Sequence, residues 1–229
     1  MNIYLDIETI PTDRAAVRDY IAATITPPGT MKKAETIAAW VKDDKPAAIE
    51  EAVNRTSLDG AFGRVFCIGW AVDDDAPTSL YGMNEPTILE AFAAVLHDMP
   101  VSERFSTTII GHNVAAFDLR FLVQRYIVNG IRPPFVIAKA AEAKPWEKST
   151  VYDTMVQWAG AGNRVSLDKL CLALGIESPK GELDGSKVWQ WVQDGKHEEV
   201  AAYCERDVAA AREVHRRMTF AHSFEDVPA

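Results

Sequence analysis

The sequence predicts an α/β domain with one helical insertion after its first strand. Three features of the 229-residue chain indicate this class: a strand-like alternation that begins at Asn2, an apolar run at residues 64–72, and amphipathic helical stretches that alternate with β-prone stretches afterwards. No internal repeat or linker divides the chain. We therefore expect a single domain over residues 1–229.

The first predicted strand, residues 2–9, alternates between apolar and polar side chains. Asp6 and Glu8 therefore project from the same face. Burying two carboxylates is costly unless something neutralises them, and a divalent cation would do so. The pair marks either a metal site or a strand end that opens to solvent.

Residues 11–62 have a different composition, rich in alanine and charged residues and interrupted by Pro27-Pro28-Gly29. The segment closes at Asp59-Gly60, which favours a turn. We expect two or three helices here, inserted between the first two strands. No spacing in this segment is typical of a catalytic motif.

The later elements follow in chain order. We expect strands at 64–72, 78–81 and 107–111, helices at 86–96 and about 116–128, and a short strand or helix start at 150–155. Ser166 is a typical N-cap for a helix that ends at Gly175. A further helix ends near Gly195, and a long one runs from His197 to Met218 with acidic residues at its start and basic residues at its end, as the helix dipole favours.

Two further acidic positions lie far along the chain from Asp6 and Glu8. Asp118 falls in the first turn of a predicted helix just after a strand, which is also where an aspartate simply favours the helix dipole. Tyr203 and Asp207 are four residues apart on the last helix and so share one face. The alternative for this pair is a surface charge beside an interfacial tyrosine.

Composition restricts the function. A net charge of −9 disfavours a protein that coats nucleic acid through bulk electrostatics. Residues 120–169 nevertheless hold eight basic and four acidic residues, which indicates either a solvated surface or a strip that follows a polyanion. The chain shows no membrane-spanning stretch, no secretory signal and three scattered cysteines, so we expect a cytoplasmic protein without disulfides or a zinc site.

If the four carboxylates converge, they cannot all ionise without a counter-charge. Two divalent cations would cancel that charge, and ligands that are all oxygen favour Mg²⁺ or Mn²⁺. Such a metal pair hydrolyses phosphodiesters. Tyr203 would orient the attacking water, because a phenol is protonated at neutral pH and is a poor general base.

The motifs resemble those of a known family. Asp6-Ile7-Glu8-Thr9, Asn113-x-x-x-Phe117-Asp118 and Tyr203-x-x-x-Asp207 are similar, in order, to the three motifs of the DEDD exonucleases. The tyrosine indicates the DEDDy branch, which includes the proofreading domains of family B DNA polymerases; the histidine branch would place histidine where this chain has Ala202. The whole chain most resembles stand-alone predicted exonucleases related to that proofreading domain.

The resemblance implies a ribonuclease H-like, three-layer fold with a mixed central sheet and 3′-to-5′ hydrolysis of single-stranded nucleic-acid ends. It implies that Asp6, Glu8, Asp118 and Asp207 bind two Mg²⁺ or Mn²⁺ ions and that Tyr203 contacts the water. Thr9, Asn113 and His112 become candidates for substrate contact, although a structural histidine is the commoner explanation for His112.

Three functions stay open on the sequence. The first is an exonuclease that favours DNA over RNA, and the second is an exoribonuclease with the same site, because phosphodiester chemistry does not report the sugar. The third is a catalytically silent module that binds nucleic-acid ends or a protein, which fold alone does not exclude.

Overall fold

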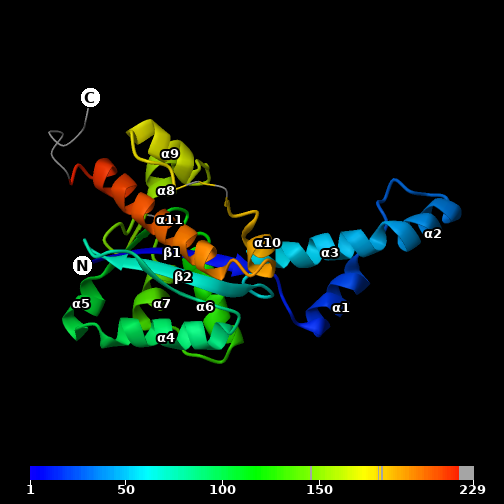
Figure 1. Ribbon diagram of the computed structural model, residues 1–229, viewed down its shortest axis with the longest axis horizontal. Coiled ribbons are helices and arrows are strands. Elements are labelled where there is room, and N and C mark those ends of the chain that lie inside the picture. Colours follow the sequence, from blue (N-terminus) through cyan, green and yellow to red (C-terminus); the bar gives the residue numbers. More distant parts are fainter. Residues whose placement is uncertain (145, 180, 182, 222–229) are drawn as a thin grey trace. The chain divides into compact units, whose positions relative to one another are not determined.

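A mixed five-stranded sheet lies at the centre of the computed structural model, which describes residues 1–144, 146–179, 181 and 183–221 (Figure 1). Its strands are β1 (Asn2–Ile10), β2 (Arg64–Val72), β3 (Thr78–Tyr81), β4 (Thr108–Gly111) and β5 (Val151–Asp153). They lie in the order β3-β2-β1-β4-β5. The β1–β4 and β4–β5 pairs are parallel, and the β2–β3 pair is antiparallel. The predicted mixed sheet is confirmed.

The chain divides into two compact units: Met1–Glu8 with Val65–Ala229, here called the sheet unit, and Thr9–Arg64, here called the helical unit. The helical unit contains α1 (Ala15–Thr24), α2 (Ala34–Asp43), α3 (Lys45–Arg55) and the 3₁₀ helix η1 (Thr56–Leu58). This is the helical insertion after the first strand that the sequence predicts.

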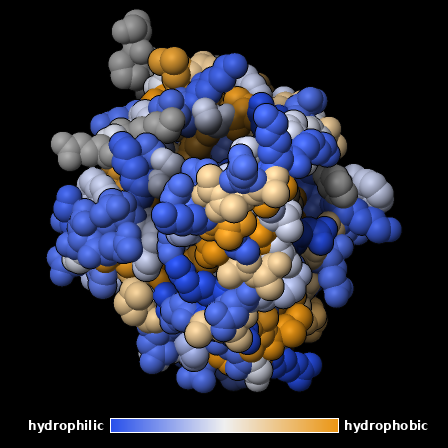
Figure 2. Space-filling model, turned by 90° about the vertical axis from the view of Figure 1, so that its right-hand side faces the viewer, coloured by the Kyte–Doolittle hydropathy of each residue, from blue (hydrophilic) through white to orange (hydrophobic). Residues whose placement is uncertain are grey.

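The helical unit has a small core of its own. Val17 and Ile21 of α1 are buried against Val53 of α3, and an ion pair joins Arg18 to Glu50 across the same two helices. It also leaves large apolar side chains exposed, namely Tyr20, Val41 and Leu58. Figure 2 shows a group of hydrophobic residues near the middle of the surface that it draws.

Helices cover both faces of the sheet in the sheet unit (Figure 1). They are α4 (Glu85–Asp98), α5 (Val101–Ser106), α6 (Asp118–Val128), α7 (Phe135–Glu142), α8 (Thr154–Ala159), α9 (Leu167–Leu174), α10 (Val188–Gln193) and α11 (His197–Met218). The largest core cluster packs α4, α6 and α7 against one face. The other face carries α11, whose Val208 is buried against Tyr4 of β1 and Ala71 of β2.

Close packing of α11 on β2 depends on a glycine. A Cβ atom added to Gly69 would lie 2.7 Å from Sγ of Cys204 and 3.3 Å from a methyl group of Val208. Both distances are shorter than ordinary van der Waals contact, so a side chain at this position would push the helix away from the sheet. The position of α11 matters because it carries Tyr203 and Asp207.

Two short helices, α5 and α7, were not predicted from the sequence. The second of them, α7, begins directly after the proline pair Pro133-Pro134. Proline suits a helix start because the first N–H groups of a helix lack intrahelical partners in any case. The helix is stable here because Val136, Ile137 and Ala140 are buried in the main core.

Cys67, Cys171 and Cys204 are free thiols, and all three are buried. Among the residues that the structure describes, no helix combines the length and the apolar character needed to cross a membrane.

Candidate active site

The strand β1 sends its two acidic side chains toward α11. Ile3, Leu5 and Ile7 belong to the core on the α4 side, and Tyr4 is buried against Val208 of α11. Because alternate residues of a strand face opposite sides, Asp6 and Glu8 lie on the same side as Tyr4. The alternation that the sequence predicts for this strand is confirmed by these contacts.

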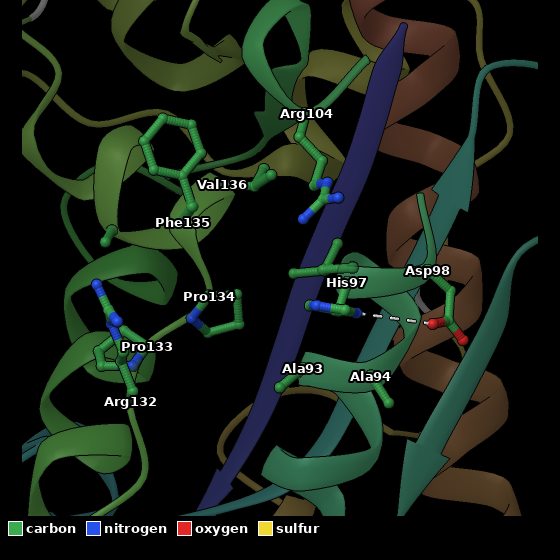
Figure 3. A pocket seen from close by; sticks show the side chains of 12 residues that line it. Ala93, Ala94, His97, Asp98, Arg104, Arg132, Pro133, Pro134, Phe135 and Val136 are labelled. Atoms are coloured by element: carbon green, nitrogen blue, oxygen red, sulfur yellow. Dashed lines mark ion pairs between the residues drawn. The ribbon is translucent and has the colours of Figure 1, made fainter. Parts of the chain in front are cut away.

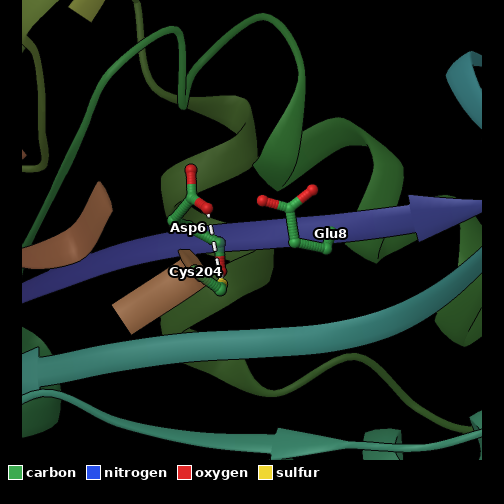
Figure 4. Close-up of side chains that lie close together, drawn as sticks. All are labelled: Asp6, Glu8 and Cys204. Carbon is green, nitrogen blue, oxygen red and sulfur yellow. Dashed lines mark hydrogen bonds between the residues drawn. The ribbon is translucent and has the colours of Figure 1, made fainter. Parts of the chain in front are cut away.

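Figure 4 shows the carboxylates of Asp6 and Glu8 on the same side of β1. One ligand atom each of Asp6, Glu8 and Cys204 lie within 4.8 Å of one another. Glu8 is 7% exposed and Asp6 is half-buried, so the pair does not lie at a strand end that opens fully to solvent.

Asp118, the first residue of α6, reaches β1 directly. Its Oδ1 accepts a hydrogen bond from the backbone N–H of Ile7 at 3.0 Å. Ile7 lies between Asp6 and Glu8 in the sequence, so this bond fixes the start of α6 beside both carboxylates. Asp118 is only 3% exposed.

The electrostatics of the site link Asp207 to the other three carboxyls. Burial raises the pKa of Asp6 well above its usual range, and the charges of Asp207 and Asp118 raise it further. The pKa of Glu8 is raised by the same causes, burial first and then Asp207. Burial also raises the pKa of Asp118 to about 7, although hydrogen bonds from backbone N–H groups lower it.

Tyr203 lies one turn before Asp207 on α11 and is buried. Its pKa is raised, chiefly by burial and then by the charges of Asp207 and Glu8, and a hydrogen bond with Asp207 adds to the effect. The phenol is therefore protonated at neutral pH and can act as a hydrogen-bond donor. Sequence spacing predicted that Tyr203 and Asp207 point into one volume, and these interactions agree with that prediction.

The chemistry of this site suits hard divalent cations. Among the residues that the structure describes, no lysine or arginine forms an ion pair with Asp6, Glu8 or Asp118. Buried carboxylates without a cationic partner are costly. Carboxylate oxygens are the ligands that Mg²⁺ and Mn²⁺ prefer, so the residues present fit such ions.

Of the candidate substrate contacts, His112 is held at both ring nitrogens. Nδ1 lies 3.0 Å from Oγ1 of Thr154, and Nε2 lies 2.8 Å from the carbonyl oxygen of Val165. Burial lowers the pKa of His112, so the ring is neutral. These bonds give the histidine a structural position between β4, α8 and the segment before α9.

Thr9 and Asn113 also have defined local partners. Thr9 belongs to the helical unit, where its hydroxyl donates to the carbonyl oxygen of Ser57 at 2.6 Å. Asn113 has a φ of +63°, a left-handed conformation that asparagine tolerates better than most residues. Its backbone N–H donates to Asp153.

Asp153 was not among the residues selected from the sequence, although it organises the segment that leads to Asp118. It is 3% exposed and lies at the end of β5. Its carboxylate accepts hydrogen bonds of 3.0 to 3.3 Å from four backbone N–H groups, those of Asn113, Ala115, Met155 and Val156. The same side chain thus caps α8 and holds the loop between β4 and α6.

The signal for Asp153 was present but incomplete in the sequence. An aspartate between a short β-prone stretch and a helical one predicts an N-cap. The second role depends on the parallel pairing of β5 with β4, which places Asp153 opposite Gly111 and so beside the loop that follows. Pairing of distant strands is not evident from local sequence.

Cys204 is a second unexpected neighbour. Its Sγ lies 3.4 Å from Oδ2 of Asp6 and 3.5 Å from the carbonyl oxygen of the same residue (Figure 4). Burial raises the pKa of Cys204 well above its usual range, so it is a neutral thiol that donates weakly to Asp6.

Comparison with known proteins agrees with this geometry. Residues 58–224 match the model of a family described as a predicted 3′-5′ exonuclease related to the exonuclease domain of PolB. No curated protein is significantly similar in sequence.

The fold is similar to part of the family B DNA polymerase from the hyperthermophilic archaeon Pyrobaculum calidifontis, with a TM-score of 0.58 and 14% sequence identity. The similarity covers 95% of this chain and 24% of the polymerase, so the chain spans about a quarter of that protein.

Proposed function

Because the chain belongs to the family of predicted 3′-5′ exonucleases related to the exonuclease domain of PolB, we propose that it hydrolyses single-stranded DNA from the 3′ end with divalent metal ions. One observation supports the proposal: ligand atoms of Asp6 and Glu8 lie within 4.8 Å of each other on β1, and Asp118 accepts a hydrogen bond from the N–H of Ile7, the residue between them. Since this family is related to a DNA polymerase domain, DNA is the favoured substrate.

Four carboxylates would hold the ions, those of Asp6, Glu8, Asp118 and Asp207. Two bound Mg²⁺ or Mn²⁺ ions would supply an activated water and neutralise the charge on the scissile phosphate. In the reaction, the water oxygen bonds to phosphorus, the bond from phosphorus to the 3′ oxygen breaks, and that oxygen gains a proton. A nucleoside 5′-monophosphate is released.

Tyr203 would position the water. With its pKa raised, the phenol keeps its proton and does not act as a base. Its hydrogen bond with Asp207 fixes the side chain on the same helix that presents that carboxylate. A positioned water needs less reorganisation to reach the phosphate, which is the contribution we assign to this residue.

The hydrogen bond from the Ile7 N–H to Asp118 would hold this metal ligand in position before any ion binds. It ties α6 to the middle of β1. The position of the Asp118 carboxylate is therefore fixed by a backbone N–H group and not by a flexible side chain of another residue. Preorganised ligands of this kind favour the near-ideal geometry that Mg²⁺ requires.

The test is digestion of 3′-end-labelled and 5′-end-labelled single strands in Mg²⁺ and in Mn²⁺, with EDTA as the metal-free arm. We expect 5′-labelled DNA to shorten one nucleotide at a time and 3′-labelled DNA to release labelled mononucleotide at once. Asp207→Asn should abolish the reaction. Glu198→Gln is the matched control, because Glu198 is exposed in the first turn of the same helix.

The same assay separates the alternatives. Faster digestion of RNA than of DNA would make the protein an exoribonuclease. Binding of single-stranded ends without hydrolysis in either metal would indicate a silent module. Shortening of 3′-labelled strands from the 5′ end would contradict the proposed direction.

A further inference from the structure

A cavity on the opposite side of the sheet from α11 has no part in the chemistry described above. It has a volume of about 730 Å³ and lies where α4, α5 and α7 meet in the sheet unit (Figure 3). Pockets of about 300 to 1,000 Å³ are typical of ligand sites. Most of its lining is apolar, with Ala93, Ala94, Leu96, Pro133, Pro134, Phe135, Val136 and Ala138.

The aromatic edge of the cavity is fixed and exposed. The rings of Phe105 on α5 and Phe135 on α7 lie 4.9 Å apart between centroids, and they are 61% and 49% exposed. The ammonium group of Lys139 donates to the carbonyl oxygen of Phe105 at 2.8 Å, which ties α5 to α7. Val101 is also 60% exposed on the same short helix. Exposed apolar side chains gathered beside a pocket are typical of an interaction site.

A cation points into this apolar pocket. Figure 3 shows the guanidinium of Arg104 directed toward the space between Pro134 and His97. Its Nε is buried, and it has no hydrogen-bond partner among the residues that the structure describes. Leaving a buried donor unsatisfied costs about 1 to 3 kcal/mol, and more for a charged group. A ligand carboxylate in the cavity would give the accessible part of this guanidinium an acceptor.

The charges around the cavity favour an anion. Arg132 lines it as a second arginine and is exposed. The acidic residue of the lining, Asp98, lies 3.8 Å from Nδ1 of His97, and both side chains are at least 80% exposed. The protein as a whole has a net charge of −9, but the two arginines give this cavity a positive charge that attracts anionic groups.

From these observations we propose that the cavity is a docking site for a protein partner, which inserts a peptide segment that combines apolar side chains with carboxylates. The apolar walls would take an aliphatic or aromatic side chain, and Arg104 and Arg132 would pair with the carboxylates. A nucleic acid fits less well, because its phosphates need a continuous basic surface and most of this lining is apolar.

Docking here would leave the proposed active site accessible. Asp6 and Glu8 face α11, whereas α4 and α7 pack on the other face of the sheet (Figure 1). A partner bound to the cavity would therefore bring the protein to its substrate and would not block it. This inference does not depend on the proposed nuclease function.

The test uses the full chain and a phage-displayed library of random peptides. We expect the enriched peptides to combine aromatic or aliphatic residues with aspartate or glutamate, and a synthetic consensus peptide to bind more weakly as salt concentration rises. Binding is measured by fluorescence anisotropy of the labelled peptide.

Two variants that change the cavity in different ways distinguish a loss of binding from a loss of folding. Arg104→Gln removes the charge, and Ala94→Trp fills the cavity from an exposed position on α4. Each should weaken binding of the consensus peptide at least tenfold, while the thermal melting temperature stays as in the wild type. Arg120→Gln, an exposed arginine that does not line this cavity, should have no effect.

The proposal is overturned if no peptide is enriched or if the enriched peptides lack acidic residues. It is equally overturned if a folded Ala94→Trp protein binds the consensus peptide as well as the wild type does. Competition of the peptide by single-stranded DNA at Arg104 would assign the cavity to nucleic acid and would also reject a protein partner.

Discussion

The strongest prediction concerns the stability of the metal-free protein, in which buried carboxyls repel one another. The pKa of Asp118 rises from 3.8 to about 7 on folding, mainly because the side chain is buried. A carboxyl whose pKa is higher in the folded state takes up a proton on folding at pH values between the two. Stability must therefore fall as the pH rises from about 4 to about 7, and this contribution is constant above that range.

The size of the effect follows from the interval. One unit of pKa corresponds to about 1.4 kcal/mol, so the interval from 3.8 to about 7 corresponds to roughly 4 kcal/mol at pH 8. Asp118→Asn removes this penalty and keeps Oδ1 as the acceptor for the Ile7 N–H. In EDTA at pH 8 the variant should be more stable than the wild type by up to about 4 kcal/mol, and at pH 5 the difference should be about 3 kcal/mol smaller.

Urea denaturation in EDTA between pH 5 and pH 8 measures these free energies. His112 and His215, whose pKa values are lowered by burial, titrate in both proteins, and their contributions cancel in the difference. Asp43→Asn, at an exposed position of α2, is the control and should change nothing. Saturating Mn²⁺ should reverse the order, because the ion stabilises the wild type and binds the variant weakly.

A variant no more stable than the wild type at pH 8 in EDTA would refute this reasoning. A difference between variant and wild type that is the same at pH 5 as at pH 8 would refute it too. Either result would mean that Asp118 is not a buried acid with a raised pKa, and the case for paired metal ions would lose its physical basis.

Three further predictions follow from individual contacts. Tyr203→Phe should lower the single-turnover rate of hydrolysis about 100-fold, because the water loses the hydroxyl group that positions it, yet leave stabilisation by Mn²⁺ unchanged; weaker Mn²⁺ binding would show that the phenol is a ligand. Asp153→Ser keeps an N-cap for α8 but loses the hydrogen bond from Asn113. We therefore expect the unfolding free energy to fall by about 2 to 3 kcal/mol and Mn²⁺ binding, measured by calorimetry, to weaken. An unchanged Mn²⁺ affinity would mean that Asp153 only caps α8. Glu85→Gln removes the carboxylate that pairs with the buried Arg125 at 2.7 Å and should cost about 3 to 5 kcal/mol in urea denaturation without changing Mn²⁺ affinity; a small cost would mean that the pair is replaceable.

Much of the fold could be predicted because its main elements have strong local patterns. The alternation in β1, the apolar run in β2 and the dipole-matched charges of α11 depend only on neighbouring residues. The placement of Asp6 and Glu8 on one face follows directly from a strand period of two. That Tyr203 and Asp207 share a face follows from the helical period.

Other features depend on contacts between distant segments, which no local pattern contains. The helix α7 follows a proline pair and is stabilised by tertiary burial of Val136 and Ile137. The four hydrogen bonds of Asp153 require β5 to pair with β4. The second glycine with a packing role, Gly111, is similar: a Cβ atom there would lie 2.6 Å from the carbonyl oxygen of Leu5.

The charge of the protein and the burial of its carboxylates lead to one more consequence. A protein with a net charge of −9 repels a polyanion, and the acidic pocket adds to that repulsion at the place where the 3′ end would lie. Divalent ions bound by Asp6, Glu8, Asp118 and Asp207 would cancel the local charge and supply positive charge for the phosphate. Substrate affinity, and not only the rate of hydrolysis, should therefore depend on the metal, because the metal-free site repels the anionic 3′ end and the metal-loaded site attracts it.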